Sequence, residues 1–284
     1  MELDIASAMY RTHELSPDGK RLAAHRHINV NNAGDIWITE LARNLTTRFT
    51  FEGSHNFGPV WSPDGSSIVY SSVRERAVAN LYKKASSGAA REELLLETAE
   101  AKQADDWSRD GRSILYEVNT SQGRDLWVLP LSGDRKPVPF LKTQFNERKG
   151  RFSPDGKWIA YTSNESGEDQ VYLQPFPPNG GKWQISTNGG IEPRWRGDGR
   201  ELYYVNNAAN PKLMAVPIQW STVPEPGAPR EIPTLQMGNM GLDGANQYVV
   251  TADGQRFIMQ SSTQQQTGPV PISILVNWPA GLKK

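Results

Sequence analysis

Apolar and polar positions alternate on both sides of a turn that recurs six times along the chain. A large apolar residue lies three positions after the glycine that closes each turn, and an apolar or aromatic residue lies five positions after it. This period of two is typical of β-strands. Another large residue, such as Trp61, Trp107 or Trp195, lies four positions before the glycine. We interpret these aromatics as packing between neighbouring sheets, not as ligand platforms.

Each turn contains the dipeptide Asp-Gly, preceded by Ser-Pro in three of the six. Proline presets the backbone for a turn, aspartate bonds to nearby backbone N–H groups, and glycine accepts a positive φ. Successive turn glycines lie 43 to 46 residues apart, except for a last interval of 55 residues. The turns occupy residues 16–19, 62–65, 108–111, 153–156, 196–199 and 251–254. A period of about 40–50 residues indicates a propeller or another repeat array.

Two further strand-like segments follow most of these hairpins, for example 35–37 and 47–50 after the first. Four antiparallel strands in each of six units predict an all-β fold, a six-bladed β-propeller that occupies residues 1–284 as a single domain. The sixth unit lacks a fourth strand, and residues 2–6 have no other role in the first unit. Because propellers close on themselves to avoid open sheet edges, residues 2–6 are predicted to complete the last blade.

The composition excludes several classes of function. Lysine plus arginine and aspartate plus glutamate both number 31, and no basic run with interleaved aromatics is present, so nucleic-acid binding is not expected. The absence of cysteine excludes disulfides and thiolate chemistry. No apolar stretch approaches the length of about 20 residues that a membrane helix needs, and no leader peptide is seen. We expect a monomer without direct membrane insertion, extracytoplasmic if its parent is membrane-anchored and otherwise cytoplasmic.

The sequence lacks the signatures of serine hydrolases, zinc peptidases and nucleotide-binding loops. His25 and His27 are the candidate metal ligands, because residues two apart on a strand face the same side. A third ligand from His55 or His13 would complete such a site, and the alternative is a pair of histidines at a solvated strand end. The sequence predicts no cofactor. Two metal sites are left open as alternatives: a transition metal at these histidines and Ca²⁺ in the acidic loop 165–169.

The predicted ligand-binding region is the mouth of the propeller channel, built from the loops that enter each first strand and those that join the second strand to the third. Residues two positions before each turn, such as Glu14, are expected to point into the channel. The predicted ligand-binding residues are His55, Asn56, Asp106, Glu147, Arg148, Arg151, Glu192 and Arg194. Their mixed charges fit either the recognition of a peptide or small polar ligand, or a lining of mutually neutralising charges.

The repeat also carries a family likeness. Trp-Ser-Pro-Asp-Gly at 61–65, followed by alternating apolar residues and a Leu-Tyr strand, resembles the PD40, TolB-like propeller repeat, a WD40-like unit. Residues 151–167, 171–177 and 277–284 look like the C-terminal propellers of bacterial eukaryotic-like Ser/Thr protein kinases. The resemblance implies a sensor or interaction module attached after a kinase domain. The chain itself has no His-Arg-Asp and no Asp-Phe-Gly motif, so it is not expected to be a kinase.

Two functional hypotheses follow from these observations. The favoured one is a non-catalytic module that recognises a protein, peptide or cell-envelope ligand at the channel mouth, because the chain carries no catalytic motif. The alternative is a metal-dependent propeller enzyme of the lyase or lactonase type that uses His25 and His27. A bound metal that depends on both histidines would discriminate the second hypothesis from the first.

Overall fold

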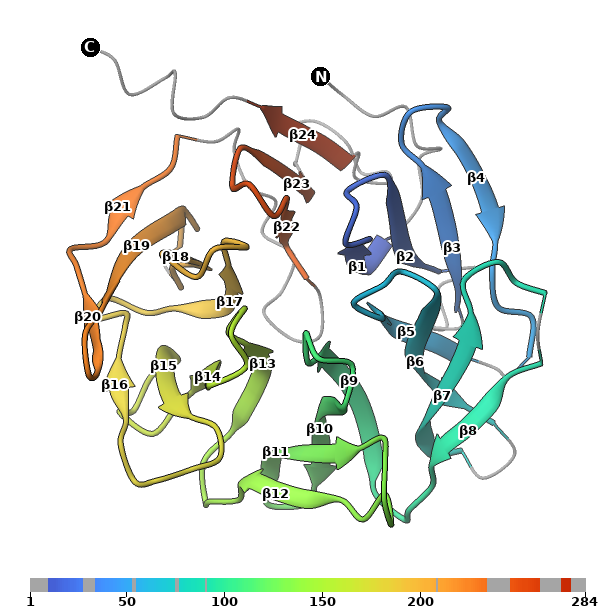
Figure 1. Ribbon diagram of the computed structural model, residues 1–284, viewed down its shortest axis with the longest axis horizontal. Helices are drawn as coiled ribbons and strands as arrows, with labels where there is room; N and C mark the ends of the chain where they lie inside the picture. Colours follow the sequence, from blue (N-terminus) through green and yellow to red (C-terminus); the bar gives the residue numbers. More distant parts are fainter. Residues whose placement is uncertain are drawn as a thin grey trace.

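The chain folds as an all-β propeller, as the sequence predicts (Figure 1). The computed structural model describes residues 10–27, 34–52, 55–74, 77–89, 91–207, 209–233, 246–260 and 272–276. In these ranges the strands form hydrogen-bonded sheets of eight, four, four, five and three strands, arranged as groups around a central axis, and three strands of the last group are described. Within the described residues, no helix is long and apolar enough to cross a bilayer. Six blades and a single domain over 1–284 remain predictions, and the closing segment 2–6 lies outside the described residues.

Each group runs outward from a strand that lines the central channel (Figure 1). The first strands are β1 (Tyr10–Leu15), β5 (His55–Trp61), β9 (Ala101–Trp107), β13 (Glu147–Phe152), β17 (Ile191–Trp195) and β22 (Tyr248–Val250). The second strands are β2 (Arg21–His27), β6 (Ser67–Val73), β10 (Ser113–Thr120), β14 (Trp158–Ser163), β18 (Glu201–Val205) and β23 (Arg256–Gln260). The third strands are β3 (Gly34–Glu40), β7 (Ala79–Ala85), β11 (Gly123–Pro130), β15 (Gln170–Pro175), β19 (Leu213–Trp220) and β24 (Ile272–Val276). The outer strands are β4 (Leu45–Arg48), β8 (Glu93–Leu96), β12 (Val138–Leu141), β16 (Trp183–Gln184), β20 (Pro224–Pro226) and β21 (Arg230–Glu231).

The hydrophobic core lies between neighbouring blades. The residue three positions after each turn glycine is fully buried, as the 0% exposure of Leu22 and Ile114 illustrates. Ile114 lies in one core cluster with Val69 of the preceding blade. Leu22 packs in one cluster with Val249 and Ile258, so side chains join the first blade to the last. Burying each such side chain stabilises the fold by roughly 1.5–3 kcal/mol, and the repeat therefore encodes the contacts that hold the blades together.

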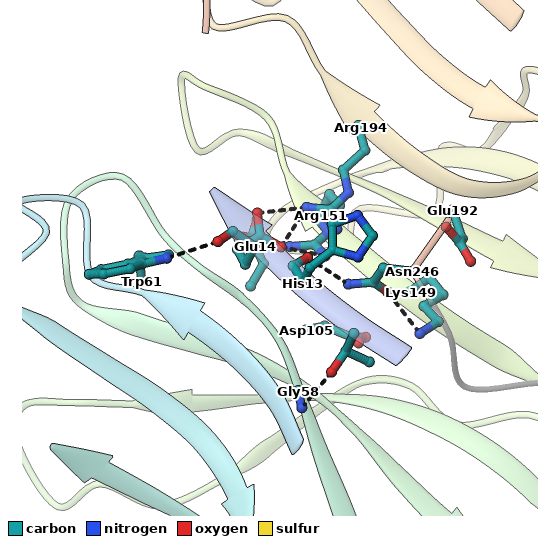
Figure 2. A network of polar contacts seen from close by, with 12 residues as sticks. His13, Glu14, Gly58, Trp61, Asp105, Lys149, Arg151, Glu192, Arg194 and Asn246 are labelled. Atoms are coloured by element: carbon teal, nitrogen blue, oxygen red, sulfur yellow. Dashed lines mark hydrogen bonds and ion pairs between the residues drawn. The ribbon is translucent and has the colours of Figure 1, made fainter. Parts of the chain in front are cut away.

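A β-bulge interrupts the channel strands β5, β13 and β17, whose register against the second strand shifts in the middle of each. The shifted positions hold Gly58, Lys149 and Glu192, with φ of 61°, 56° and 56°. A bulge re-aims side chains relative to a regular strand. Left-handed backbone is unfavourable for residues other than glycine, yet it brings the Lys149 and Glu192 side chains into the network of buried polar groups shown in Figure 2.

The first two blades are also joined through their backbones. Gly34 of β3 pairs with His27 on one side and forms a parallel bridge with His55 of β5 on the other. A Cβ at position 34 would lie 2.3 Å from Nε2 of His25, so glycine leaves the space that this imidazole occupies. The pairing thereby places His25, His27 and His55 next to one another.

Candidate ligand-binding site

The predicted site residues lie at two ends of the channel. The end that carries the Asp-Gly turns is here called the turn mouth, and the opposite end, where loops enter the first strands, is called the loop mouth. The structure brings three of the predicted residues together near the turn mouth: Asp106, Arg151 and Arg194. It places the others at or near the starts of their strands, on the loop-mouth side: His55, Asn56, Glu147, Arg148 and Glu192.

A cavity of about 140 Å³ opens at the turn mouth. Its charged floor consists of Glu14, Asp106, Arg151 and Arg194, which come from four different channel strands. Its rim is mostly apolar, with Trp61, Trp107, Phe152, Trp195, Pro17, Pro63 and Pro154, and it also carries the exposed cation Arg109. Concave sites with an apolar lining and a few convergent polar groups are the usual form of ligand-binding sites. The rim derives from the repeated turn motif, whereas the charged floor differs from blade to blade.

Two arginines converge on Glu14 at the cavity floor (Figure 2). Arg194 Nη1 lies 2.7 and 2.6 Å from the two Glu14 carboxylate oxygens. Arg151 Nη2 lies 3.2 Å from Glu14, and Arg151 Nη1 lies 3.7 Å from Asp106. The arginine side chains are 7% and 9% exposed, and those of Glu14 and Asp106 are 17% and 23% exposed. Among these four floor residues, the carboxylates are therefore the more exposed charges.

Burial and neighbouring charge act differently on these two carboxyl groups. Burial pushes the pKa of Glu14 upward, but Arg151 and Arg194 together outweigh burial and hold that pKa below its usual value. Burial raises the pKa of Asp106, and the nearby Glu14 charge raises it further, while Arg151 offsets only part of this effect. Burial thus favours the neutral form of Asp106, whereas the two arginines favour the ionised form of Glu14.

The middle of the channel is filled by buried polar side chains (Figure 2). Lys149 Nζ donates to Asn246 at 3.2 Å, and Asn246 donates to the backbone carbonyl of His13 at 3.3 Å. The Glu192 carboxylate accepts the backbone N–H of Gln247 at 2.7 Å. Burial raises the pKa of Glu192, and Lys149 partly offsets the increase. These contacts tie the blades together across the axis.

At the loop mouth the predicted residues are held by neighbouring side chains. Arg148 pairs with Asp169 at 2.6 Å, and the Asn56 amide donates to Asp35 at 3.0 Å. Glu147 accepts the Thr143 hydroxyl at 2.6 Å. Burial raises the pKa of Glu147 to about 7. Each residue therefore has a structural contact in addition to any role in binding.

Three of the four histidines form a cluster near the loop mouth. The His25 ring lies 4.6 Å from that of His27 and 4.9 Å from that of His55, measured between centroids. Burial lowers the pKa of all three, well below the usual value for His25 and to about 4 for His55. His13, the other candidate third ligand, lies apart in the channel, where burial lowers its pKa to about 4. His55 is thus the neighbour that joins the His-x-His pair.

The histidine cluster has the donor types of a transition-metal site but not the arrangement. Both ring nitrogens of His25 and His27, and Nε2 of His55, are buried without a hydrogen-bond partner. Neutral imidazoles of this kind are good metal ligands. Among the described residues, however, no group of three or more His, Asp or Glu side chains is positioned to hold a metal ion.

Sequence reasoning placed Glu14 in the channel but did not identify it as the centre of the site. The packing interpretation of the aromatic residues holds for Trp61, which is 5% exposed. Trp107 and Trp195 are half-buried, and the faces that they expose form part of the cavity rim. The sequence contained the information needed to identify the charged floor, because Glu14, Asp106, Arg151 and Arg194 share one position in the repeat.

Comparison with known proteins shows the fold of the chain. No protein-family model matches it. TolB from Acinetobacter baumannii has a TM-score of 0.66 at 17% identity, over 96% of this chain and 62% of that one. An oligogalacturonate lyase solved in complex with manganese has a TM-score of 0.64 at 12% identity, over 99% and 93% of the two chains. The chain therefore has a TolB-like propeller fold, which both a TolB protein and an enzyme share.

Sequence similarity extends to a curated protein of Bacillus subtilis (strain 168) named "uncharacterized peptidase YuxL". The two are 26% identical over 201 residues, which is 56% of this chain and 30% of the relative. The similarity thus spans less than a third of the relative's own length.

Proposed function

We propose that this TolB-like propeller is a non-catalytic binding module that holds a peptide segment of a protein partner at the turn mouth. The observation that carries the proposal is the cavity itself, with a charged floor from four blades and a rim of tryptophan and proline. Aromatic side chains supply large contact areas for peptide recognition. The floor charges supply specificity, because a buried polar group rejects ligands that leave it unpaired.

The two carboxylates, which are the more exposed charges of the floor, favour a cationic group as the part of the ligand that enters. Asp106 Oδ2 accepts the N–H of Phe152 at 2.8 Å. Arg151 lies 3.7 Å from Oδ1, which is beyond hydrogen-bond distance. An ionised carboxylate has about four acceptor sites, so Asp106 retains capacity for an incoming ammonium or guanidinium. The aliphatic part of a lysine or arginine would then lie against the tryptophan rim.

Selection of phage-displayed random dodecapeptides on the immobilised protein tests this proposal. We expect the selected peptides to share a lysine or arginine, and Asp106→Asn to weaken their binding about tenfold in calorimetric titrations. The amide oxygen introduced by Asp106→Asn can still accept the Phe152 N–H, so folding should be preserved. Asp134→Asn, at an exposed position, is the matched control. Selected peptides without a cationic residue, or equal binding by Asp106→Asn, would contradict the assignment.

The proposal extends to the protein that contains the module. The likeness of residues 151–167 to propellers that follow kinase domains supports a role as the C-terminal sensor of a receptor-like kinase. An antiserum raised against the chain, whose mass is 31.6 kDa, should then detect a much larger native protein in membrane fractions of its source. A native band near 31.6 kDa would contradict this context.

A second candidate function is a metal-dependent enzyme, and the proximity of His25, His27 and His55 is the observation in its favour. The manganese in the oligogalacturonate lyase structure adds support from a propeller of similar fold. Thermal-shift titrations of chelator-treated protein with Mn²⁺, Zn²⁺ and Ca²⁺ decide the question, because a ligand of the folded state raises the melting temperature. An increase in melting temperature that is abolished by the double substitution His25→Ala and His27→Ala would support the enzyme hypothesis. The absence of any increase would remove this hypothesis.

A further inference from the structure

Arg109 is the one charged residue among the turn residues that surround the mouth of the cavity. The second residue of the six turns is, in chain order, Pro17, Pro63, Arg109, Pro154, Gly197 and Ala252. Five of these residues, all except Gly197, line the cavity. The repeat therefore places an uncharged residue at this position in every unit except the third, where it places a cation.

The turn that carries Arg109 does not need an arginine. Its Ser108 hydroxyl donates to Asp110 at 2.6 Å, and its Gly111 N–H donates to the Ser108 carbonyl at 2.8 Å. The same two hydrogen bonds, with the same lengths, hold the proline-containing turn at 62–65. Proline presets the backbone at this position, so its replacement by arginine gives up some rigidity and leaves the hydrogen bonds unchanged. The reason for a cation here must lie outside the turn.

Arg109 is also the charge on the cavity lining that lacks a counter-charge. On the floor, two carboxylates face two arginines, so their formal charges cancel. Arg109 is exposed, and among the described residues no hydrogen bond or ion pair involves its side chain. A guanidinium of this kind binds a carboxylate through two parallel N–H donors. The mouth of the cavity therefore favours an anionic group, whereas the floor offers its carboxylates to a cation.

The two opposite preferences lie close together in the chain. Asp106 on the floor and Arg109 at the mouth are three residues apart, so their backbones are separated by at most about 11 Å. Trp107 lies between them in the sequence and contributes an aromatic side chain to the rim. From the inside outward, the third blade thus presents a carboxylate, an apolar surface and a guanidinium.

The last residue of a polypeptide has the complementary order of groups when it is lysine or arginine. Its side chain ends in a cation, its methylene stem is apolar, and its backbone ends in a carboxylate. An internal lysine has no such carboxylate. A free amino acid has one, but the guanidinium of Arg109 would repel the α-ammonium beside it. One cation and one anion, joined by an apolar stem, are the charges of a basic chain end.

We propose that the turn mouth binds the C-terminal lysine or arginine of a partner polypeptide, with the side-chain cation at Asp106 and the terminal carboxylate at Arg109. The position of the cation rests on the proposed function. The requirement for a chain end rests instead on Arg109, on its place in the cavity and on its lack of a partner among the described residues.

The test uses two short peptides, each titrated into the full chain by calorimetry. One is acetyl-Gly-Ser-Gly-Lys with a free C-terminal carboxylate, and the other is the same peptide with an amidated C-terminus. The acetyl group removes the N-terminal charge, so the two peptides differ only in the charge at the chain end. We expect the free acid to bind about tenfold more tightly than the amide. Asp106→Asn should weaken the binding of both peptides, because both carry the lysine.

Variants of Arg109 identify the group that recognises the carboxylate. Arg109→Gln should bind the two peptides equally, with the affinity that the unchanged protein has for the amide, and Arg109→Lys should retain part of the preference for the free acid. Both variants alter an exposed side chain, so they should fold; circular dichroism verifies this. Arg112→Gln is the matched control, because the Arg112 side chain is 79% exposed beside the same turn and is not part of the cavity lining.

The outcomes separate this inference from the proposed function. Equal affinity of the unchanged protein for the free acid and the amide, with weaker binding of both by Asp106→Asn, overturns the chain end and preserves the proposed function. A preference for the free acid that Arg109→Gln abolishes and Asp106→Asn leaves intact supports the chain end and contradicts the proposed position of the cation. An equal loss of preference in Arg112→Gln, or no binding of either peptide at millimolar concentration, overturns the inference.

Discussion

Arg194 and Glu14, 180 residues apart in the sequence, meet at the channel with one guanidinium nitrogen 2.7 and 2.6 Å from the two carboxylate oxygens. The pair joins the first blade to the fifth across the axis of the ring. Arg151 approaches the same carboxylate at 3.2 Å. Glu14 is thus an anion shared by two largely buried arginines.

Removal of Glu14 should therefore destabilise the fold strongly. Glu14→Ala leaves two buried guanidiniums with less compensation, and breaking such a pair costs about 3–5 kcal/mol. Urea unfolding followed by tryptophan fluorescence measures the change in the free energy of unfolding. Glu40→Ala is the control, because the Glu40–Arg43 pair is 45% and 71% exposed and such pairs contribute about 0–1 kcal/mol. Equal losses in the two variants would contradict a structural role for the pair at the channel.

A second prediction concerns the dependence of stability on pH. Burial raises the pKa of Glu147 from 4.5 to about 7. Between these values the folded protein keeps a proton that the unfolded chain has lost. The contribution of Glu147 to stability is therefore complete below pH 4.5 and is lost as the pH rises through 7.

Glu147→Gln should accordingly raise the melting temperature at about pH 8 and change it little at about pH 4, because glutamine stays neutral and can still accept the Thr143 hydroxyl. Glu225→Gln, at an exposed position, provides the control at both pH values. A loss of stability in Glu147→Gln at the higher pH would show that the ionised form is the one that the fold favours.

A third prediction follows from the channel-strand bulges. Gly58 has φ of 61°, and a Cβ there would meet Gln103 Cγ at 3.3 Å and the Ala104 carbonyl at 3.4 Å. Gly58→Ala should cost the roughly 1–2 kcal/mol of a left-handed residue plus a packing term. Gly88→Ala measures the backbone cost alone, because Gly88 has φ of 76° and no atom lies within 4 Å of a Cβ placed at that position. Equal costs in thermal unfolding would rule out the packing term.

The sequence was sufficient to predict the strands, the turns and much of the core. Turn chemistry and a period of two are local properties, and they correctly identified Leu22 and Ile159 as buried. The bulges were not predicted. Lys149 has positive φ because the strand slips against its partner, and no local propensity of lysine indicates this conformation.

The site was only partly predictable for a related reason. Asp106, Arg151 and Arg194 were identified from their position in the repeat, but which of them meet depends on how the ring closes. The histidine cluster illustrates the same limit, since His55 joins His25 and His27 through the bridge from Gly34. Contacts across blades are set by tertiary geometry, which a single repeat does not encode.

The last prediction separates two tryptophans that the repeat makes equivalent. The Trp61 indole N–H donates to the backbone carbonyl of Glu14 in the preceding blade at 3.0 Å, and Arg21 lies 4.5 Å from its ring centroid. The Trp107 indole N–H instead donates at 3.1 Å to Gly111 in its own turn. Trp61→Phe loses a contact between blades, whereas Trp107→Phe loses a local one at the cavity rim.

We expect Trp61→Phe to lower the free energy of unfolding by about 1–3 kcal/mol, since it removes the hydrogen bond to the Glu14 carbonyl and weakens a cation–π contact. Trp107→Phe should cost less, because its side chain is half-buried and water can reach the rim. Urea titrations of both variants under identical conditions measure the difference. If Trp107→Phe lowers the free energy of unfolding as much as Trp61→Phe does, the hydrogen bond to Glu14 does not help to hold the first two blades together. Packing alone would then account for the stabilising contact between these blades.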